Sequence, residues 1–389
     1  MMTAGVRESA QDHVRRTIVI VACGTVLAAA SACTRATPPD ILLITVDTLR
    51  ADAIEPYGAI DTLTPNIASF AEQSTVYESA TTPMPLTRPA HASILTGLYP
   101  DQHGVLTNRQ ILPKGTATLA GILRKAGYLT AGFTGVRFLN QRSGLAHGFD
   151  TFHAPKKGDA IRGKDVVDRA RHWLENSIPD SPVFLWVHTY DPHQPYNPLR
   201  TFRRGIDPKL ERRAPSINFK RLNRVARDND GDIPEDVCRL TLDYYRFEVE
   251  YTDFWIGRLL KNFERLRGSR PSMVILTADH GECFENGIYF EHADCLYEGS
   301  LQVPLIVRYP DGSGAGLRVE HRVSNLDIMP TVLAELSLPI PETIAGLPLR
   351  GDFTSEDRDG ILVRLPDRKR PEKVPFRLRA IRSVAGEPV

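Results

Sequence analysis

Two apolar runs in the chain each end in an aspartate. Residues 40–46 and 272–278 are mostly apolar, and Asp47 and Asp279 follow them directly. A continuous apolar run is typical of a parallel strand that is buried on both faces. Because the carboxyl ends of such strands meet at one rim of an open α/β sheet, where ligands bind, we expect the two carboxylates to lie together. The alternative interpretation is that each aspartate only caps the helix or turn that follows it.

Strand-like and helix-like patterns alternate along the rest of the chain. Further strands are expected at residues 129–133, 184–187 and 305–307. Helices are expected at residues 66–72, 119–126, 166–176, 235–266 and 328–336. This alternation predicts an α/β fold with a doubly wound, mostly parallel sheet.

The segment Thr87-Arg88-Pro89-Ala90-His91 stands at the predicted start of another helix. Pro89 suits a first helical turn, because its ring fixes φ near the helical value and its missing N–H would have no partner there. We expect the helix to begin just after Thr87. An anion bound there would meet free backbone N–H groups and the positive end of the helix dipole. Thr87 is therefore a candidate nucleophile for a phosphate or sulfate ester, although a hydroxyl beside a helix start is also an ordinary cap.

The composition indicates the size of the expected domain and shows a nearly balanced charge. The chain has 389 residues and is 42% hydrophobic, which is enough for the core of one large α/β domain. Its formal net charge is +1, so no general attraction to polyanions is implied and no nucleic acid partner is predicted. The segment 199–227 is rich in Arg and Lys, which indicates either a solvated loop or a contact for an anionic polymer.

The first residues have the layout of a secretory signal. Arg15 and Arg16 precede an apolar run over residues 17–30, and the small residues before Cys33 resemble a lipobox. We expect residues 1–33 to form a signal peptide that ends at a lipidated Cys33, and residues 34–39 to form a linker. The protein would then be exported to the periplasm or cell surface and held at the membrane by a lipid. The alternative is a transmembrane anchor, for which the apolar run is short.

Few cysteines remain after the predicted signal peptide. They are Cys238, Cys283 and Cys295, which make neither a disulfide framework nor a zinc-knuckle spacing. Cys283 and Cys295 flank the region after Asp279, and a disulfide between them is one possibility.

Several motifs in order resemble the alkaline phosphatase superfamily and, within it, the sulfatase branch. They include Asp191-Pro192-His193 and Asp279-His280-Gly281-Glu282. Further matches lie at residues 44–52, 64–67, 95–100, 103–105 and 296–307. The resemblance runs from about residue 40 to residue 341. It implies a catalytic domain over residues 40–345 and a small, incomplete C-terminal subdomain over residues 346–389.

The nucleophile position departs from the sulfatase pattern. Sulfatases usually carry a Cys or Ser there, which is oxidised to formylglycine, with an Arg four residues later; this chain has Thr87 and His91. Threonine is not a known precursor of formylglycine, so none is expected. The Thr-x-Pro-x-His variant resembles nucleotide pyrophosphatase and phosphodiesterase relatives, in which the threonine itself attacks phosphorus. The resemblance thus makes Thr87 and His91 catalytic residues.

The resemblance also implies a metal site. It assigns as ligands Asp47, Thr87, Asp279 and His280. One divalent ion is expected, because a threonine hydroxyl is a weak nucleophile at neutral pH without a metal. Zinc, manganese, calcium and magnesium all remain candidates, and the imidazole favours zinc or manganese.

Three further positions match residues that surround the substrate in relatives. Asn108 corresponds to an amide donor to the bound ester and His193 to a substrate-binding histidine. His292 lies where relatives have a Lys or His near the leaving group, which makes it a candidate general acid. Asp191, His193 and His292 could instead form a second metal site, and His292 could be an ordinary hydrogen-bonded histidine.

Three functions are compatible with these residues. The first is a metal-dependent hydrolase that cleaves small-molecule or glycan sulfate or phosphate esters by attack of Thr87 through a covalent intermediate. Phosphate esters are favoured, because a threonine-bound sulfate has no second hydroxyl on the same carbon and can leave only by displacement with water. The second is a transferase of phosphoethanolamine or a similar group to a surface glycan. The third is a binding protein without catalysis.

Overall fold

The structure is a computed structural model that describes most of the chain after residue 36. The described residues are 37–156, 160–177, 180–206, 208–212, 233–285, 288–293, 295–350, 360–364 and 379–383. Residues 37–389 form one compact unit. The predicted signal peptide, Cys33 and most of the predicted linker lie outside the described residues, as does part of the basic segment 199–227.

An eight-stranded mixed sheet forms the centre of the fold. Its order is β10-β2-β9-β6-β1-β5-β3-β4, and only β9 runs antiparallel to its neighbours. The strands are β1 (Asp40–Val46), β2 (Thr75–Thr81), β3 (Leu129–Thr134), β4 (Thr151–His153), β5 (Val183–Thr189), β6 (Ser272–Ala278), β9 (Gln302–Arg308) and β10 (Arg318–Ser324). The predicted mostly parallel sheet is confirmed. The strands that the sequence did not predict are β2, β4 and β10.

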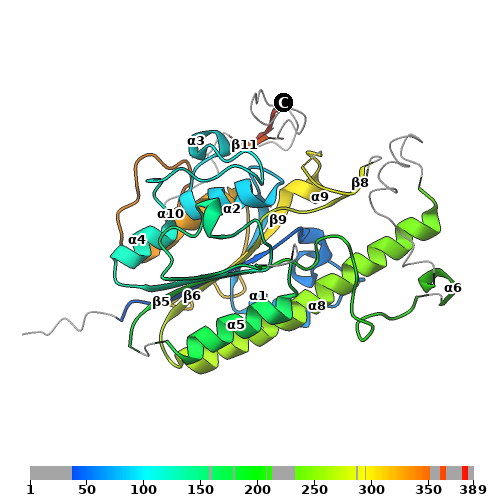
Figure 1. The fold of residues 1–389 in the computed structure, drawn as a ribbon, viewed down its shortest axis with the longest axis horizontal. Helices are drawn as coiled ribbons and strands as arrows, with labels where there is room; N and C mark the ends of the chain where they lie inside the picture. The colour runs from blue at the N-terminus through cyan, green and yellow to red at the C-terminus, as the bar shows by residue number, and fades with distance from the viewer. Residues whose placement is uncertain are drawn as a thin grey trace, which may run out of the picture. The chain divides into compact units, whose positions relative to one another are not determined.

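Helices cover both faces of this sheet (Figure 1). One face carries α1 (Pro65–Glu72), α5 (Gly163–Glu175) and α8 (Glu235–Arg267), and the other carries α2 (Thr87–Thr96), α4 (Leu119–Lys125) and α10 (Ile328–Glu335). Short helices are α3 (Pro100–His103), α6 (Pro208–Glu211) and α9 (Glu298–Leu301). Because helices protect both faces, the central strands are buried on both sides and need no polar alternation. The predicted doubly wound arrangement is therefore confirmed.

The strand register brings the two predicted carboxylates together. β1 lies between β5 and β6, and Val46 is paired with Thr189 on one side and Ala278 on the other. The residues that follow, Asp47 and Asp279, therefore leave neighbouring parallel strands at the same level. Every residue of β1 is buried, including the charged Asp40.

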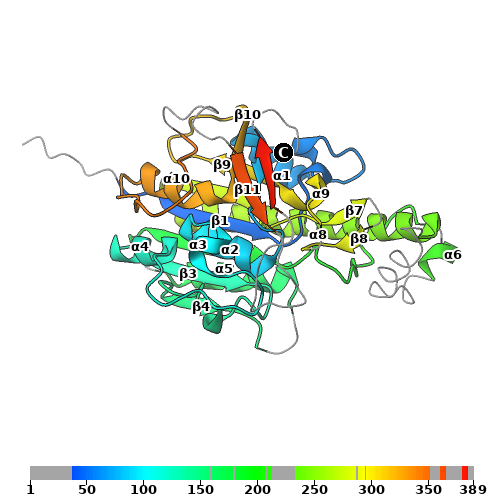
Figure 2. The ribbon, with the colours of Figure 1, turned by 90° about the horizontal axis from the view of Figure 1, so that it is seen from above.

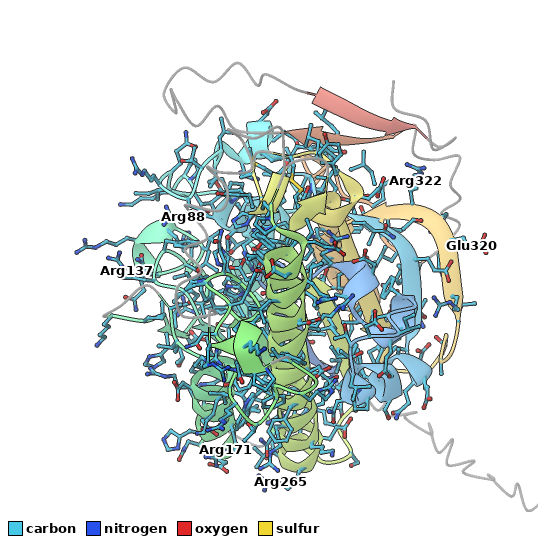
Figure 3. All side chains as sticks on the ribbon, turned by 90° about the vertical axis from the view of Figure 1, so that its right-hand side faces the viewer. Arg88, Arg137, Arg171, Arg265, Glu320 and Arg322 are labelled. Atoms are coloured by element: carbon cyan, nitrogen blue, oxygen red, sulfur yellow. A yellow bond between two sulfur atoms is a disulfide. The ribbon has the colours of Figure 1, made fainter. Side chains whose placement is uncertain are left out.

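Asp40 anchors the long helix α8 to the amino end of β1. Its carboxylate accepts from the Arg267 guanidinium at 2.7 Å and from the backbone N–H of Val183 at 2.8 Å. Arg267 is the last residue of α8, whereas the nearby Arg265 extends toward solvent (Figure 3). This buried ion pair sets where α8 ends against the sheet.

Two small hairpins lie outside the main sheet. β7 (Cys283–Glu285) pairs with β8 (Ile288–Glu291), and β11 (Gly360–Arg364) pairs with β12 (Arg379–Ser383). Ile361 and Val363 of β11 pack against Leu301 at the end of α9. Figure 2 shows the strand β11 lying over the main sheet when the molecule is seen from above. The proposed division of the chain at residue 345 stays a prediction. Among the described helices, none has both the length and the apolar character needed to cross a membrane.

Candidate active site

Asp47, Asp279 and His280 meet at the carboxyl rim of the sheet. One ligand atom from each lies within 4.8 Å of the other two. The Nε2 atom of His280 is 3.5 Å from Asp279 Oδ2 and 3.7 Å from Asp47 Oδ1. Within the described residues, this is the one group of three acidic, histidine or cysteine side chains that close together.

Three of the four carboxylate oxygens of this group lack hydrogen-bond donors, whereas Asp279 Oδ1 accepts from the backbone N–H of His280 at 2.9 Å. Both oxygens of Asp47 and the Oδ2 of Asp279 are buried without a partner. Burial, with the negative charges of Asp279 and Glu282 added, holds the pKa of Asp47 well above its ordinary range. Burial likewise raises the pKa of Asp279 to about 7. Such carboxylates are costly to bury unless a cation compensates them.

The residues present fit a divalent cation with mixed oxygen and nitrogen ligands. The Nδ1 of His280 lies 2.9 Å from the backbone oxygen of Gly281. A carbonyl only accepts, so Nδ1 carries the proton and Nε2 turns its lone pair toward the same space as the carboxylate oxygens of Asp47 and Asp279. A histidine whose other nitrogen is held by a carbonyl is the usual form of a metal ligand. Zinc and manganese suit this set.

Backbone contacts hold the loops that carry these ligands. Thr48 has a φ of 54°, which a threonine rarely adopts, directly after Asp47. The Tyr245 hydroxyl of α8 donates to the Thr48 carbonyl at 2.9 Å. On the other strand, a Cβ on Gly281 would lie 1.9 Å from the Gly299 oxygen. Only a glycine allows this close approach of the two backbones.

Thr87 begins helix α2 beside this group. The helix starts at Thr87 itself, one residue earlier than predicted, and Pro89 occupies its first turn. The Thr87 hydroxyl oxygen lies 3.4 Å from His280 Nε2. The structure therefore brings together all four predicted metal ligands, with the hydroxyl at the positive end of a helix dipole.

His91 lies behind the nucleophile position, one turn along α2. Its Nδ1 donates to the Thr87 carbonyl at 2.7 Å, so its Nε2 accepts from the Thr45 hydroxyl at 3.0 Å. The Thr45 oxygen in turn accepts from the Trp186 indole at 2.9 Å. Burial lowers the pKa of His91 to about 4, which keeps this ring neutral. Both ring nitrogens of the predicted catalytic His91 thus take part in a network that orients Thr87.

Arg88 and Asn108 shape the loop beside the first turn of α2. Asn108 Oδ1 accepts from the Arg88 backbone N–H at 2.7 Å, which leaves the amide nitrogen to donate to a ligand. The Arg88 guanidinium is buried and donates to the backbone oxygens of Gln110 and Phe138. Sequence reasoning missed this Arg88 contact, because its acceptors are backbone atoms of two distant loops.

His193 and His292 form an imidazole cluster with His280. The ring of His292 lies 4.4 Å from the ring of His280 and 5.0 Å from that of His193. His292 Nδ1 lies 2.9 Å from Glu282 Oε1, and His193 Nδ1 lies 2.6 Å from the Gln194 oxygen. The predicted substrate-binding and general-acid residues therefore lie next to the metal ligands.

Asp191, the third member of the possible second metal site, is engaged elsewhere. Its carboxylate accepts from the Arg162 guanidinium at 2.6 Å and from the Gly163 backbone N–H at 2.7 Å. Arg162 also pairs with Glu248 of α8 at 3.0 Å. These bonds tie α5 and α8 to the loop after β5, and they leave only His193 and His292 of that group facing the site.

Two groups at the site were not singled out from the sequence. His188 of β5 lies with its Nε2 3.6 Å from Asp47 Oδ2, and Glu282 binds His292. His188 falls within an apolar strand, so nothing local marked it. Glu282 stands in the quoted Asp-His-Gly-Glu motif, which was a usable signal. The possible disulfide is confirmed, because Cys283 and Cys295 are bonded.

Comparisons with known proteins agree on one family. The family model described as Sulfatase matches residues 39–337. The ulvan-active sulfatase of Formosa agariphila is 25% identical over 340 residues, which cover 80% of this chain and 64% of that relative. The choline-sulfatase of Rhizobium meliloti is 27% identical over 357 residues, covering 77% and 68% of the two chains. The chain thus spans about two thirds of the length of these relatives.

A solved structure shows the same fold. The phosphonate monoester hydrolase of Agrobacterium radiobacter superposes with a TM-score of 0.68 at 19% identity, covering 90% of this chain and 88% of that one. At this identity the likeness concerns the fold alone.

Proposed function

The chain belongs to the sulfatase family, and from that premise we propose that it is a metal-dependent hydrolase of sulfate or phosphate esters with Thr87 as nucleophile. The observation that carries the proposal is the position of Thr87. Its hydroxyl stands at the start of a helix, within 3.4 Å of the buried His280 Nε2, and beside the buried Asp47 and Asp279, whose carboxylates have unpartnered oxygens. No other hydroxyl of α2 combines these two features.

Each site residue has a role in this proposal. Asp47, Asp279, His280 and Thr87 would hold the ion, which supplies charge to lower the pKa of the hydroxyl and to polarise the ester. The Thr87 hydroxyl would release its proton to solvent as its oxygen bonds to phosphorus or sulfur, and the bond to the ester oxygen would break as that oxygen takes a proton from protonated His292. Asn108 would donate its amide N–H to an ester oxygen, and His193, whose Nδ1 proton is engaged by the Gln194 carbonyl, would accept from a substrate hydroxyl through Nε2. Water then displaces the group from Thr87 and restores the free hydroxyl.

Phosphate esters are the favoured substrates within this proposal. The formylglycine hydrate of other sulfatases expels sulfate by elimination through its second hydroxyl, and Thr87 has no second hydroxyl. A sulfated Thr87 would therefore depend on displacement by water. Relatives named for their action on ulvan or choline sulfate suggest glycan or small-molecule esters as the class to test first.

Ester hydrolysis by the purified, metal-loaded protein tests this proposal. Nitrophenyl sulfate, a nitrophenyl phosphate monoester and a phosphate diester are compared after loading with Zn²⁺ or Mn²⁺. We expect phosphate esters to turn over faster than the sulfate. Thr87→Ala should lower kcat at least about 1,000-fold, as loss of a covalent nucleophile does. Thr87→Ser keeps a hydroxyl and serves as the matched control.

Three results would contradict parts of this proposal. Faster turnover of the sulfate rejects the phosphate preference. Equal rates for Thr87→Ala and wild type reject the nucleophile. Metal binding without turnover of any ester points instead to a binding protein, and a product formed only with an added glycan acceptor points to a transferase.

We also propose that the protein is exported and anchored through a lipid on Cys33. The Cys283–Cys295 disulfide supports export, because disulfides persist mainly in oxidising compartments. Mass spectrometry of the protein from a membrane fraction tests this: a diacylglyceryl group on Cys33 is expected, and an unmodified Cys33 rejects the anchor.

A further inference from the structure

Glu282 places a buried carboxylate directly against the candidate general acid. Its Oε1 lies 2.9 Å from His292 Nδ1, and its Oε2 accepts from the Tyr196 hydroxyl at 3.0 Å. Glu282 is fully buried and His292 is 7% exposed. We propose that Glu282 is a positioning residue that keeps a proton on His292 Nδ1 and turns Nε2 into the active site.

The hydrogen-bond inventory supports this assignment. An ionised carboxylate only accepts, so the short contact to Glu282 requires a proton on Nδ1. The second Glu282 oxygen is occupied by Tyr196, which prevents the carboxylate from rotating away. Nε2 lies on the opposite edge of the His292 ring, and this ring packs between the rings of His280 and His193. Since Nδ1 is held by Glu282, Nε2 is the nitrogen that would give a proton to the departing oxygen or take one from water in this proposal.

The backbone around Glu282 is held on two sides. Its N–H donates to the Gly299 oxygen at 2.9 Å, and its own carbonyl accepts from the Arg50 guanidinium at 2.9 Å. A carboxylate fixed in this way can orient a partner precisely without losing entropy when substrate binds. Arg50 follows β1 and Gly299 lies in α9, so Glu282 is bonded to two segments that are distant in the sequence.

The disulfide closes the segment that carries both groups. Cys283 follows Glu282 directly, and Cys295 lies three residues after His292. The bond therefore limits how far the two residues can separate. This inference rests on the proposed function for its chemistry, since His292 is the acid of that reaction, but not for the position of the ring proton.

The ring proton is tested by ¹⁵N NMR of histidine side chains in the zinc-loaded protein. The His292 signals are identified by their loss in His292→Ala. We expect wild type to show a protonated Nδ1 and a Glu282→Leu variant to lose that signature. Tyr196→Phe, which removes the other bond to the same carboxylate, should keep the proton on Nδ1. A wild-type His292 protonated on Nε2 alone overturns the proposal, whether or not any ester is hydrolysed.

Kinetics test the consequence for catalysis. General acids matter most for poor leaving groups, so Glu282→Leu should slow an alkyl ester by about 100-fold and a nitrophenyl ester much less. Glu282→Gln retains a neutral acceptor and should recover part of the loss. Glu72→Gln, on the exposed end of α1, is the matched control and should leave the rate unchanged.

A double-mutant cycle separates positioning from a general structural role. If Glu282 acts through His292, Glu282→Leu causes no further loss in the His292→Ala background. Equal losses in both backgrounds overturn the proposal. If wild type hydrolyses no ester, the proposed function fails, and the NMR result still decides the position of the proton.

Discussion

At the scale of single residues, one hydroxyl in the central strand links the core to the nucleophile. The Thr45 hydroxyl oxygen accepts a hydrogen bond from the Trp186 indole N–H, and the same hydroxyl donates to His91 Nε2. His91 in turn donates through Nδ1 to the Thr87 carbonyl. All four residues are buried. The orientation of Thr87 therefore depends on a polar atom placed in an otherwise apolar strand.

Replacing Thr45 with valine tests this link. Thr45→Val keeps the shape but leaves the Trp186 N–H and His91 Nε2 without their partner. We expect it to lower the free energy of unfolding by about 1–3 kcal/mol, as an unsatisfied buried polar group does. Urea unfolding measures this, with Thr116→Val, whose half-buried side chain makes no hydrogen bond in the structure, as the control. Equal stability of Thr45→Val and the control would show that the network is unimportant.

At the scale of elements, a buried ion pair holds the end of α8 against the sheet. Arg267 and Asp40 are both almost fully buried, and Asp40 also caps the first N–H of β5. Farther along the same helix, Tyr245 holds the loop after Asp47. The helix that spans the sheet thus fixes both ends of β1.

Loss of the Arg267 charge should strongly weaken the contact between α8 and β1 and lower the free energy of unfolding. Arg267→Met leaves the buried Asp40 carboxylate with only the more distant Arg270, whose Nε lies 3.9 Å away, so we expect a loss of about 3 kcal/mol. Arg265→Met is the matched control, because Arg265 is exposed and its 3.8 Å pair with Glu175 contributes little. Denaturant midpoints for both variants measure the difference. A loss for Arg267→Met as small as that for Arg265→Met would mean that Asp40 does not need its partner.

At the scale of the whole molecule, buried histidines and buried carboxyl groups change the pH dependence of the free energy of unfolding in opposite directions. Burial lowers the pKa of His103 to about 3. Its Nδ1 accepts from the Val105 N–H, so its Nε2 donates to the Ser93 hydroxyl. Burial raises the pKa of Asp279 and of Glu248 to about 7. The lowered histidine pKa favours folding at higher pH, and the raised carboxyl pKa values favour folding at lower pH. The contribution of one group to the free energy of unfolding is therefore measured by comparison with a variant that lacks it.

His103 provides such a comparison. Below pH 6.5 the unfolded chain protonates this histidine while the folded chain does not, so stability is lost as pH falls toward 3. Between pH 7.5 and pH 5, wild type should lose about 2 kcal/mol more than His103→Gln, at 1.36 kcal/mol per pH unit below 6.5. Urea unfolding at the two pH values measures the difference. Parallel losses in both proteins would show that His103 is protonated in the folded state.

The sequence by itself determined the elements that local patterns encode. Continuous apolar runs predicted the central strands and the shared rim of Asp47 and Asp279, because burial on both faces leaves a signal in every residue. The start of α2 was predicted within one residue from Pro89. The edge strands β4 and β10 were missed, since one is three residues long and the other is half exposed.

Only the tertiary structure decided which nitrogen of each imidazole faces the site. That choice depends on acceptors far away in the chain or outside any motif, such as Thr45 for His91 and Glu282 for His292. The same holds for Asp191, whose motif suggested a ligand but whose carboxylate is held by Arg162. Sequence spacing identifies which residues reach the rim, whereas hydrogen-bond partners from other elements determine what each can do there.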